Sequence, residues 1–164
     1  MSEKSWPPRW LTEVPLEDQI RGDGDLYADF AEAVCRVTKD SVASPAGKLL
    51  SLRPWQRELL RHSLARREDG RFRHRTALVG MARKNGKSAL AASMGLAGLT
   101  VGGNGSEIYS CAADRDQARI VFGTAKRMIE MDQELSSMFT LYRDAIESVS
   151  YTHLRAHETL RYLV

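Results

Sequence analysis

The stretch RTALVGMARKNGKSALAA, residues 75–92, decides the fold. It predicts a short apolar strand, then a tight basic turn, and then an alanine-rich helix that begins at Gly-Lys-Ser. In this order the turn exposes backbone N–H groups, and the helix points the positive end of its dipole at the same place. The stretch therefore predicts a phosphate-binding loop between a strand and a helix.

Two side chains of this loop have predicted roles. Lys87 is placed to reach the β- and γ-phosphates of a nucleotide, and the Ser88 hydroxyl is placed to bind Mg²⁺. The strict motif has glycine five residues before Gly86, and Met81 occupies that position, with Gly80 one place too early. The alternative interpretation is an exposed basic turn with no ligand, which does not explain a Lys-Ser pair at a helix start.

The amino-acid sequence of the loop resembles that of a known family. Residues 81–88, MARKNGKS, resemble the variant phosphate loop of the tailed-phage large terminases, the motors that pump DNA into capsids. That family commonly has Arg-Lys-(Asn/Gly)-Gly-Lys-(Ser/Thr) and often lacks the first glycine, so Met81 favours it over a generic NTPase. The resemblance covers nearly all of residues 50–135 and implies the first half of an ATPase domain that uses ATP and Mg²⁺.

The resemblance and the loop chemistry together nominate further site residues. The backbone N–H groups from Lys84 through Asn85 and Gly86 to Ser88 are expected to cradle the phosphates. Arg83 is expected to stabilise transition-state charge, because an arginine there matches the family; the alternative is a solvated arginine. Lys87 and Arg83 are thus the catalytic candidates.

A second segment resembles the adenine-reading part of terminases. Gln56 lies in Pro-Trp-Gln ahead of the loop, and its amide can both donate to and accept from adenine. The alternative is an exposed glutamine at an ordinary helix start. The segment 110–118 is also similar to the second motif of terminases, which lies beside the nucleotide and the DNA path. There Asp114 and Gln117 have the alternative roles of a helix cap and an exposed first-turn residue.

The order of elements predicts the fold class. Strands over 75–80 and 107–113 alternate with helices over 87–101 and from 114 onward, so the sequence predicts an α/β protein. Specifically, we expect an incomplete P-loop NTPase fold with parallel β-strands flanked by helices, preceded by a helical N-terminal region. The expected helices of that region cover 25–39 and 54–64.

The expected domain boundaries are 1–24 for an extended N-terminal arm, 25–148 for a partial P-loop ATPase domain and 149–164 for a non-native tail. The tail begins VSYTHLRAHET, which closely resembles the translation of a sequencing-library adapter. His153 and His157 lie there at helical spacing, but no third metal ligand accompanies them. The sequence also has no apolar strand ending in Asp-Glu, the acidic motif that a P-loop motor needs for Mg²⁺ and water activation.

Composition sets the remaining limits. The chain has 164 residues, 43% hydrophobic and 27% charged, with a net charge of +3, which suits one soluble domain. It has no membrane span and no signal-peptide core. Cys35 and Cys111 are expected to be reduced and buried, and Trp6 and Trp10 to dock on the body. Residues 53–75 hold eight arginines against three acids, so they form either a DNA-facing patch or a solvated helix face.

The sequence therefore predicts a fragment of a viral DNA-packaging motor and endonuclease, restricted to its nucleotide-binding part. By resemblance its partners are double-stranded viral DNA, the portal protein, the small terminase subunit and further copies of the chain. Its location would be the host cytoplasm, transiently at the procapsid portal. The alternatives are another P-loop DNA translocase or helicase-like ATPase, a small-molecule kinase, or a non-enzymatic basic nucleic-acid-binding module. Whether the fragment itself is an enzyme stays open, because the acidic strand and the nuclease domain are missing from it.

Overall fold

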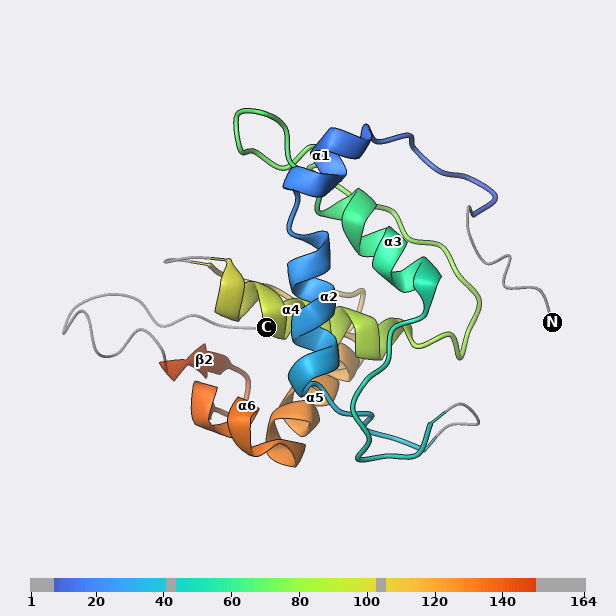
Figure 1. Ribbon diagram of the computed structural model, residues 1–164. Helices are drawn as coiled ribbons and strands as arrows, with labels where there is room; N and C mark the ends of the chain where they lie inside the picture. Colours follow the sequence, from blue (N-terminus) through green and yellow to red (C-terminus); the bar gives the residue numbers. More distant parts are fainter. Residues whose placement is uncertain (1–7, 41–43, 103–105, 150–164) are drawn as a thin grey trace. The chain divides into compact units, whose positions relative to one another are not determined.

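The computed structural model describes residues 8–40, 44–102 and 106–149 (Figure 1). The described residues form two compact units, Met1–Asp29 with Ser51–Asn85 and Phe30–Leu50 with Gly86–Val164. Their elements, in chain order, are α1 (Leu16–Arg21), α2 (Gly24–Val34), α3 (Pro54–Ser63), α4 (Lys87–Val101), α5 (Arg115–Met131), α6 (Gln133–Met138), β1 (Phe139–Leu141) and β2 (Ile146–Ser148).

The core of the second unit lies between α4 and α5. Helix α4 is apolar nearly all round and buries eight of its fifteen residues, which is typical of a helix enclosed by its neighbours. Its Leu96 and Leu99 are fully buried in the same cluster as Met128 and Ile129 of α5. Ala92 of α4 belongs to the same cluster. The predicted helix over 87–101 is confirmed with the same bounds.

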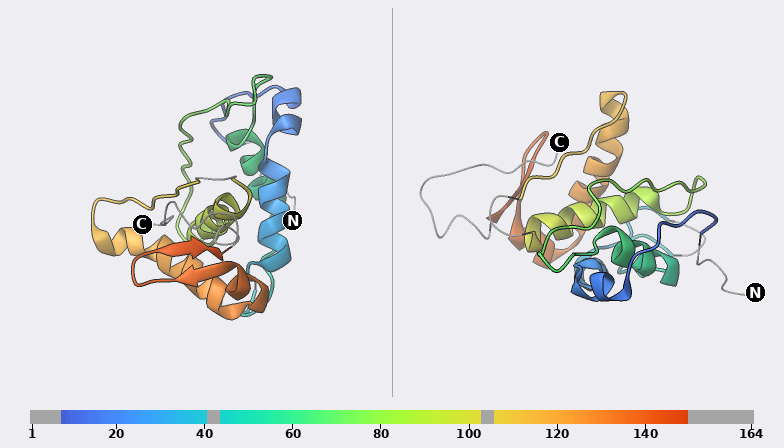
Figure 2. Two further views of the ribbon diagram at one scale, coloured as in Figure 1. Left: turned by 90° about the vertical axis from the view of Figure 1, so that its left-hand side faces the viewer. Right: turned by 90° about the horizontal axis from the view of Figure 1, so that it is seen from above.

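The second unit is completed by α6 and a short hairpin. Helix α5 packs on α6, and α6 leads directly into β1, as both views of Figure 2 show. Strands β1 and β2 pair antiparallel, with Thr140 opposite Glu147 and Leu141 opposite Ile146. Ile146 is fully buried in the core cluster, so the hairpin closes one side of the apolar interior.

In the first unit, α3 and the chain that follows it form several ion pairs with residues 18–29. Arg61 donates to Asp25 at 2.9 Å, and Arg66 donates to Asp23 at 2.6 Å. Further pairs join Arg57 to Asp29 and Arg73 to Asp18. Four of the eight arginines in this stretch are therefore paired with aspartates from residues 18–29. This arrangement fits the interpretation of a solvated helix face better than that of an open DNA-facing patch.

Helix α2 and helix α3 come unusually close where α2 begins. A Cβ atom added to Gly24 would lie 2.5 Å from Cα of Arg61 and 2.6 Å from its backbone nitrogen. Glycine is therefore required at this position by space alone. The close approach also brings Asp25 within reach of the Arg61 guanidinium. Helix α2 ends at Val34, five residues before the predicted end at residue 39.

The predicted parallel sheet is not formed among the described residues. The two named strands there, β1 and β2, are antiparallel, and neither predicted strand (75–80 or 107–113) is among them. Leu78 is 99% exposed and Val79 is 42% exposed, so the apolar side chain of Leu78 is not covered by a neighbour. A strand needs partners on its edges, and an apolar sequence alone cannot supply them. The structure therefore supports a mixed α and β fold in which the described residues form no parallel sheet.

Three smaller expectations had mixed outcomes. Cys35 is buried as predicted, and burial followed by the charge of Asp132 raises the pKa of its thiol to about 12. Cys111 is exposed, so its predicted burial is wrong. Trp10 is 84% exposed, so its predicted docking on the body is wrong.

The expected arm over 1–24 includes helix α1, and Trp6 and the tail over 150–164 with its two histidines lie outside the described residues. No helix that the structure describes is long and apolar enough to cross a membrane.

Candidate phosphate-binding loop

The loop before α4 has a backbone conformation that suits an anion. Gly86 has φ 76° and ψ 14°, in the left-handed region, and Lys84 has φ 66°. Lys84 is the single non-glycine residue with positive φ in the described ranges. Left-handed residues alternating with right-handed ones turn successive N–H groups toward one side, which forms a concave anion-binding nest. The expected cradle at residues 84–88 therefore has a suitable backbone.

Helix α4 begins differently from the two helices that follow it. Asp114 caps α5 by accepting hydrogen bonds from the N–H groups of Asp116 and Gln117, at 2.7 and 3.0 Å. Asp132 caps α6 in the same way. The N-cap of α4 is Gly86, which has no side chain, and the first turn of α4 contains no acidic residue. Neither the cap nor the first turn of α4 thus supplies a carboxylate for its first N–H groups, as expected where a ligand supplies the negative charge.

The side chains of the loop add positive charge to this geometry. Arg83, Lys84 and Lys87 are exposed, and Ser88 is half-buried at the start of the helix. Arg83 takes part in no ion pair within the part of the chain that the structure describes. These residues are neighbours in one short loop, so they lie close together along the chain. Such a loop can hold a polyphosphate through both backbone N–H groups and cationic side chains.

Gln56 lies at the start of α3 and is buried, with 8% of its surface exposed. Its Oε1 accepts a hydrogen bond of 2.8 Å from the backbone N–H of Arg53. This contact fixes the first turn of α3, with Pro54 in the first helical position as predicted. The alternative of an exposed glutamine is wrong, and adenine reading by Gln56 stays a prediction.

The structure shows the capping role of Asp114 directly. Its carboxylate accepts the two N–H bonds described above, and Gln117 is exposed in the first turn of α5. The cap interpretation is therefore confirmed for Asp114. A position beside the nucleotide or DNA remains a prediction for both residues.

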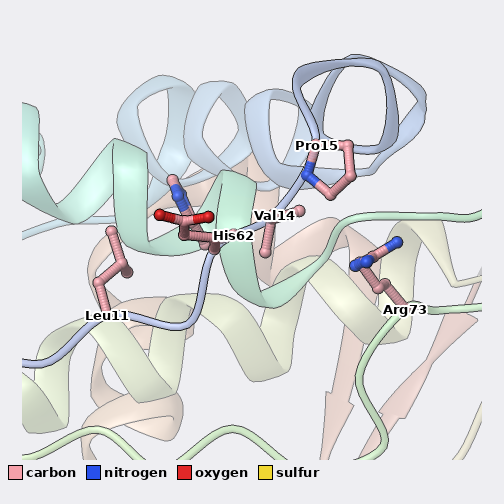
Figure 3. A pocket seen from close by; sticks show the side chains of 6 residues that line it. Leu11, Val14, Pro15, His62 and Arg73 are labelled. Atoms are coloured by element: carbon pink, nitrogen blue, oxygen red, sulfur yellow. The ribbon is translucent and has the colours of Figure 1, made fainter.

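A pocket of about 470 Å³ lies in the first unit, between the N-terminal arm and the C-terminal half of α3. Figure 3 shows Leu11, Val14 and Pro15 of the arm near His62, with Arg73 coming from the chain after α3. Arg73 is paired with Asp18, and none of the residues lining the pocket belongs to the phosphate loop. The pocket contains no nucleophile with a base beside it, so we assign it no chemistry.

Comparison with known proteins decides the family. A family model described as "Terminase large subunit, ATPase domain" matches residues 54–154, which is more than half of the chain. The chain belongs to this family. The fold is also similar to a solved structure, the crystal structure of the HK97 bacteriophage large terminase, with a TM-score of 0.61 and 25% sequence identity. No curated protein sequence matches the chain.

The predicted resemblance to the terminases is thereby confirmed. The interpretation of Met81 as a family variant stays a prediction. The structural match covers 76% of this chain and 24% of the HK97 chain. This terminase chain therefore spans about a quarter of the length of the relative whose structure is known. What the whole relative does is not automatically a property of this part.

The terminase loop fits a phosphate group better than it fits a complete metal site. In the described parts of the chain, no group of three or more His, Cys, Asp or Glu side chains could hold a metal ion. Ser88 alone offers a hydroxyl oxygen at the loop. Mg²⁺ accepts such an arrangement, since it commonly keeps several waters and takes its other ligands from substrate phosphates. The residues present thus fit Mg²⁺ delivered with a nucleotide, and not Mg²⁺ alone.

Sequence reasoning missed two features of this region. The left-handed conformation of Lys84 has no sequence signal, because lysine rarely adopts positive φ. The second feature is a groove in the first unit that ends at Gly80, Met81 and Asn85. Trp10 and Trp55 both line this groove. Trp55 belongs to the Pro-Trp-Gln segment that resembles the adenine-reading part of terminases, whereas no sequence signal connected Trp10 with the groove.

Proposed function

We propose that this chain is the nucleotide-binding part of a DNA-packaging motor and that it binds Mg²⁺-ATP on the loop 83–88. One observation carries the proposal: a loop with left-handed Lys84 and Gly86 leads into a helix whose first turn has no acidic residue. Membership in the terminase ATPase family supports ATP as the ligand. The family also favours this function over a small-molecule kinase or a module with an incidental Gly-Lys-Ser.

Each loop residue has a distinct part in the proposal. The N–H groups of residues 84–88 bind phosphate oxygens, and Lys87 places its ammonium group against the β- and γ-phosphates. The Ser88 hydroxyl binds the Mg²⁺ that arrives with the nucleotide. Arg83 balances the charge that develops on the phosphoryl group during transfer, a role that suits a fixed cation at a triphosphate.

Gln56 enters the proposal with a restriction. Because its Oε1 already accepts the N–H of Arg53, contact with adenine would use its amide NH₂ group as a donor. Its established contact orders the first turn of α3. Asp114 and Gln117 are proposed to lie near the bound nucleotide or DNA through their place in the second family motif.

The test is binding of a fluorescent ATP analogue to the folded chain, with and without Mg²⁺. We expect binding by the wild type and its loss in Lys87→Ala, with the circular dichroism spectrum unchanged. Lys48→Ala is the matched control, because Lys48 is also an exposed lysine but lies far along the chain from the loop. A wild type that folds and binds no nucleotide would overturn the proposal.

The wider activity is proposed for the complete protein. There the segment 75–80 would gain strand neighbours and join a parallel sheet, which the exposure of Leu78 and Val79 supports. ATP hydrolysis would move double-stranded viral DNA into a capsid, and a nuclease region would cut it. Further copies of the chain, a portal protein and a small terminase subunit are the proposed partners, in the host cytoplasm and at the procapsid portal.

A further inference from the structure

A row of cationic side chains runs along one side of α5 in the second unit. Arg115, Arg119 and Lys126 lie four and seven residues apart along the helix, so they occupy one stripe of its surface. The row continues onto the turn between β1 and β2, where 88% of the Arg143 side chain is exposed. These four side chains, which we call the α5 stripe, carry one positive charge each.

Hydrogen bonds join the stripe on the helix to the hairpin turn. Asp144 of the turn accepts a hydrogen bond of 2.9 Å from Arg119 and a longer one of 3.3 Å from Arg115. The Lys126 ammonium group donates to the backbone oxygen of Tyr142 at 3.2 Å. The helix and the turn therefore form one continuous basic surface inside a single unit of the chain.

The carboxylate of Asp144 does not balance this surface. Arg143 approaches Asp144 only to 3.9 Å, beyond hydrogen-bond distance, so three arginines share one carboxylate. The hydrogen bond from Arg119, together with the charges of Arg115, Arg119 and Arg143, lowers the pKa of Asp144, which therefore stays ionised at neutral pH. Four cations against one carboxylate leave a surplus of positive charge. In the first unit, by contrast, four arginines each pair with an aspartate of their own.

We propose that the α5 stripe binds the phosphate backbone of double-stranded DNA. The inference rests on the proposed function for its partner, and it adds the surface that contacts this partner. Arginines and lysines that gather on one face without matching acids are the electrostatic footprint of nucleic-acid binding. Arginine suits the contact, because its planar guanidinium can donate two hydrogen bonds to one phosphate.

The length of the stripe also suits a nucleic-acid backbone. Arg115 and Lys126 are 11 residues apart, which is about 16 Å along the axis of a helix. One DNA strand places a phosphate about every 3.4 Å along the duplex axis, so the stripe can reach across about five of them. The stripe is limited at one end by Glu130, which lies one helical turn beyond Lys126.

The aromatic residue beside the stripe favours a duplex over a single strand. Proteins that bind single strands stack successive bases on aromatic rings. Tyr142 is the aromatic residue of the turn, and its hydroxyl donates to the Glu147 carboxylate at 3.1 Å. That carboxylate would repel a strand lying over the ring. The stripe therefore offers its charges to a backbone rather than an aromatic platform to bases.

The salt dependence of duplex binding tests the proposal. The full chain is titrated into a short fluorescent DNA duplex at several salt concentrations, and anisotropy gives the binding constant at each. The slope of log K against log salt becomes shallower by about 0.9 for each phosphate contact that is lost. In the double variant Arg115→Ala/Arg143→Ala we expect the slope to become shallower by about 2, equally for two unrelated DNA sequences.

Arg127→Ala is the matched control. Arg127 is also an exposed arginine of α5, but it follows Lys126 by one residue and so lies about 100° further round the helix. Its removal should leave the slope at the wild-type value. Asp144→Asn tests the opposite sign, because it removes the negative charge within the surface and should tighten DNA binding. Each variant is compared with the wild type by circular dichroism, so that a loss of fold is recognised.

The outcomes separate this inference from the proposed function. A wild-type slope in the double variant would overturn the inference, and so would an equal change of slope in Arg127→Ala. Weaker binding by Asp144→Asn, or tighter binding of a single strand than of the duplex, would also contradict it. A wild type that binds no duplex would overturn the inference and remove DNA as a partner in the proposed function. Nucleotide binding is measured separately on the same samples, so failure at the phosphate loop is distinguishable from failure at the stripe.

Discussion

At the scale of single residues, Lys84 is the position where the backbone deviates most from what its residue type prefers. A left-handed conformation costs an L-residue about 1–2 kcal/mol, and glycine avoids that cost. We therefore expect Lys84→Gly to be more stable than Lys84→Ala by about 1 kcal/mol, since both variants lose the same charged side chain. Urea denaturation of the two variants measures the difference.

The comparison also tests the loop geometry that the proposed function needs. If Lys84→Gly and Lys84→Ala unfold at the same urea concentration, Lys84 does not hold the left-handed conformation in solution. The anion nest at residues 84–88 would then not be preformed. Both variants should keep Lys87 and Ser88 in place, so nucleotide binding can be measured on the same samples.

Asp132 has a buried carboxylate with a charged partner and two N–H partners. Burial by itself would raise its pKa, but the N–H groups of Leu135 and Glu134 and the Arg36 guanidinium outweigh this, so the pKa is lowered. Its carboxylate accepts from Arg36 Nε at 2.9 Å and is 9% exposed. A charge-assisted hydrogen bond contributes about 1.5–3 kcal/mol. We expect Asp132→Asn to lose about that much at pH 7 while keeping the helix cap, because asparagine caps as well as aspartate.

The pH dependence follows from the lowered pKa. A carboxyl group with a depressed folded-state pKa stabilises the fold above its unfolded value of about 3.9, and this stabilisation is lost as pH falls through the folded value. The free energies of unfolding of wild type and Asp132→Asn should thus converge below about pH 4. Glu130→Gln, an exposed change on α5, is the control and should show no such convergence. Parallel curves from pH 7 to pH 3 would contradict the assigned pKa.

At the scale of elements, two glycines differ in their role: one is required by close packing, and the other only lowers the helix propensity of its segment. A side chain at Gly24 would collide with the backbone of Arg61, whereas one at Gly123 on α5 would meet no atom within 4 Å. We expect Gly24→Ala to destabilise the protein by about 1–3 kcal/mol through overpacking. Gly123→Ala should stabilise it by about 0.5–1 kcal/mol through helix propensity. Thermal unfolding measures both, and equal shifts would show that α2 and α3 do not approach as described.

The helices also show which sequence patterns are sufficient to predict an element. Helices α3, α4 and α5 were predictable, because their apolar spacing, Pro54 and Asp114 are local signals that the chain itself satisfies. The acidic partners of the arginine-rich stretch were not predictable. Asp23 and Arg66 are 43 residues apart, and only the folded chain brings them together at 2.6 Å. A count of charges therefore overstated how much positive surface the first unit offers.

At the scale of the whole molecule, the sequence predicted the phosphate loop better than the sheet. The loop depends on adjacent residues, such as Gly86 and Lys87, so its geometry is set within a few peptide units. The predicted strands depend on neighbours that the described residues do not provide, and the groove depends on segments from three parts of the sequence. Residue patterns do not contain information about long-range partners, which is why Trp10 was expected to dock on the body although it is exposed.

The same distinction predicts which apolar residues stabilise the molecule. Leu78 and Leu99 both lie in apolar runs beside the loop, and sequence pattern alone would place both in the core. Leu99 is fully buried, whereas Leu78 is 99% exposed. We expect Leu99→Ala to cost about 2–5 kcal/mol of unfolding free energy and Leu78→Ala to change it by no more than about 0.5 kcal/mol. Urea unfolding followed by circular dichroism measures both, and a similar large loss in each variant would mean that the segment 76–80 is packed in solution after all.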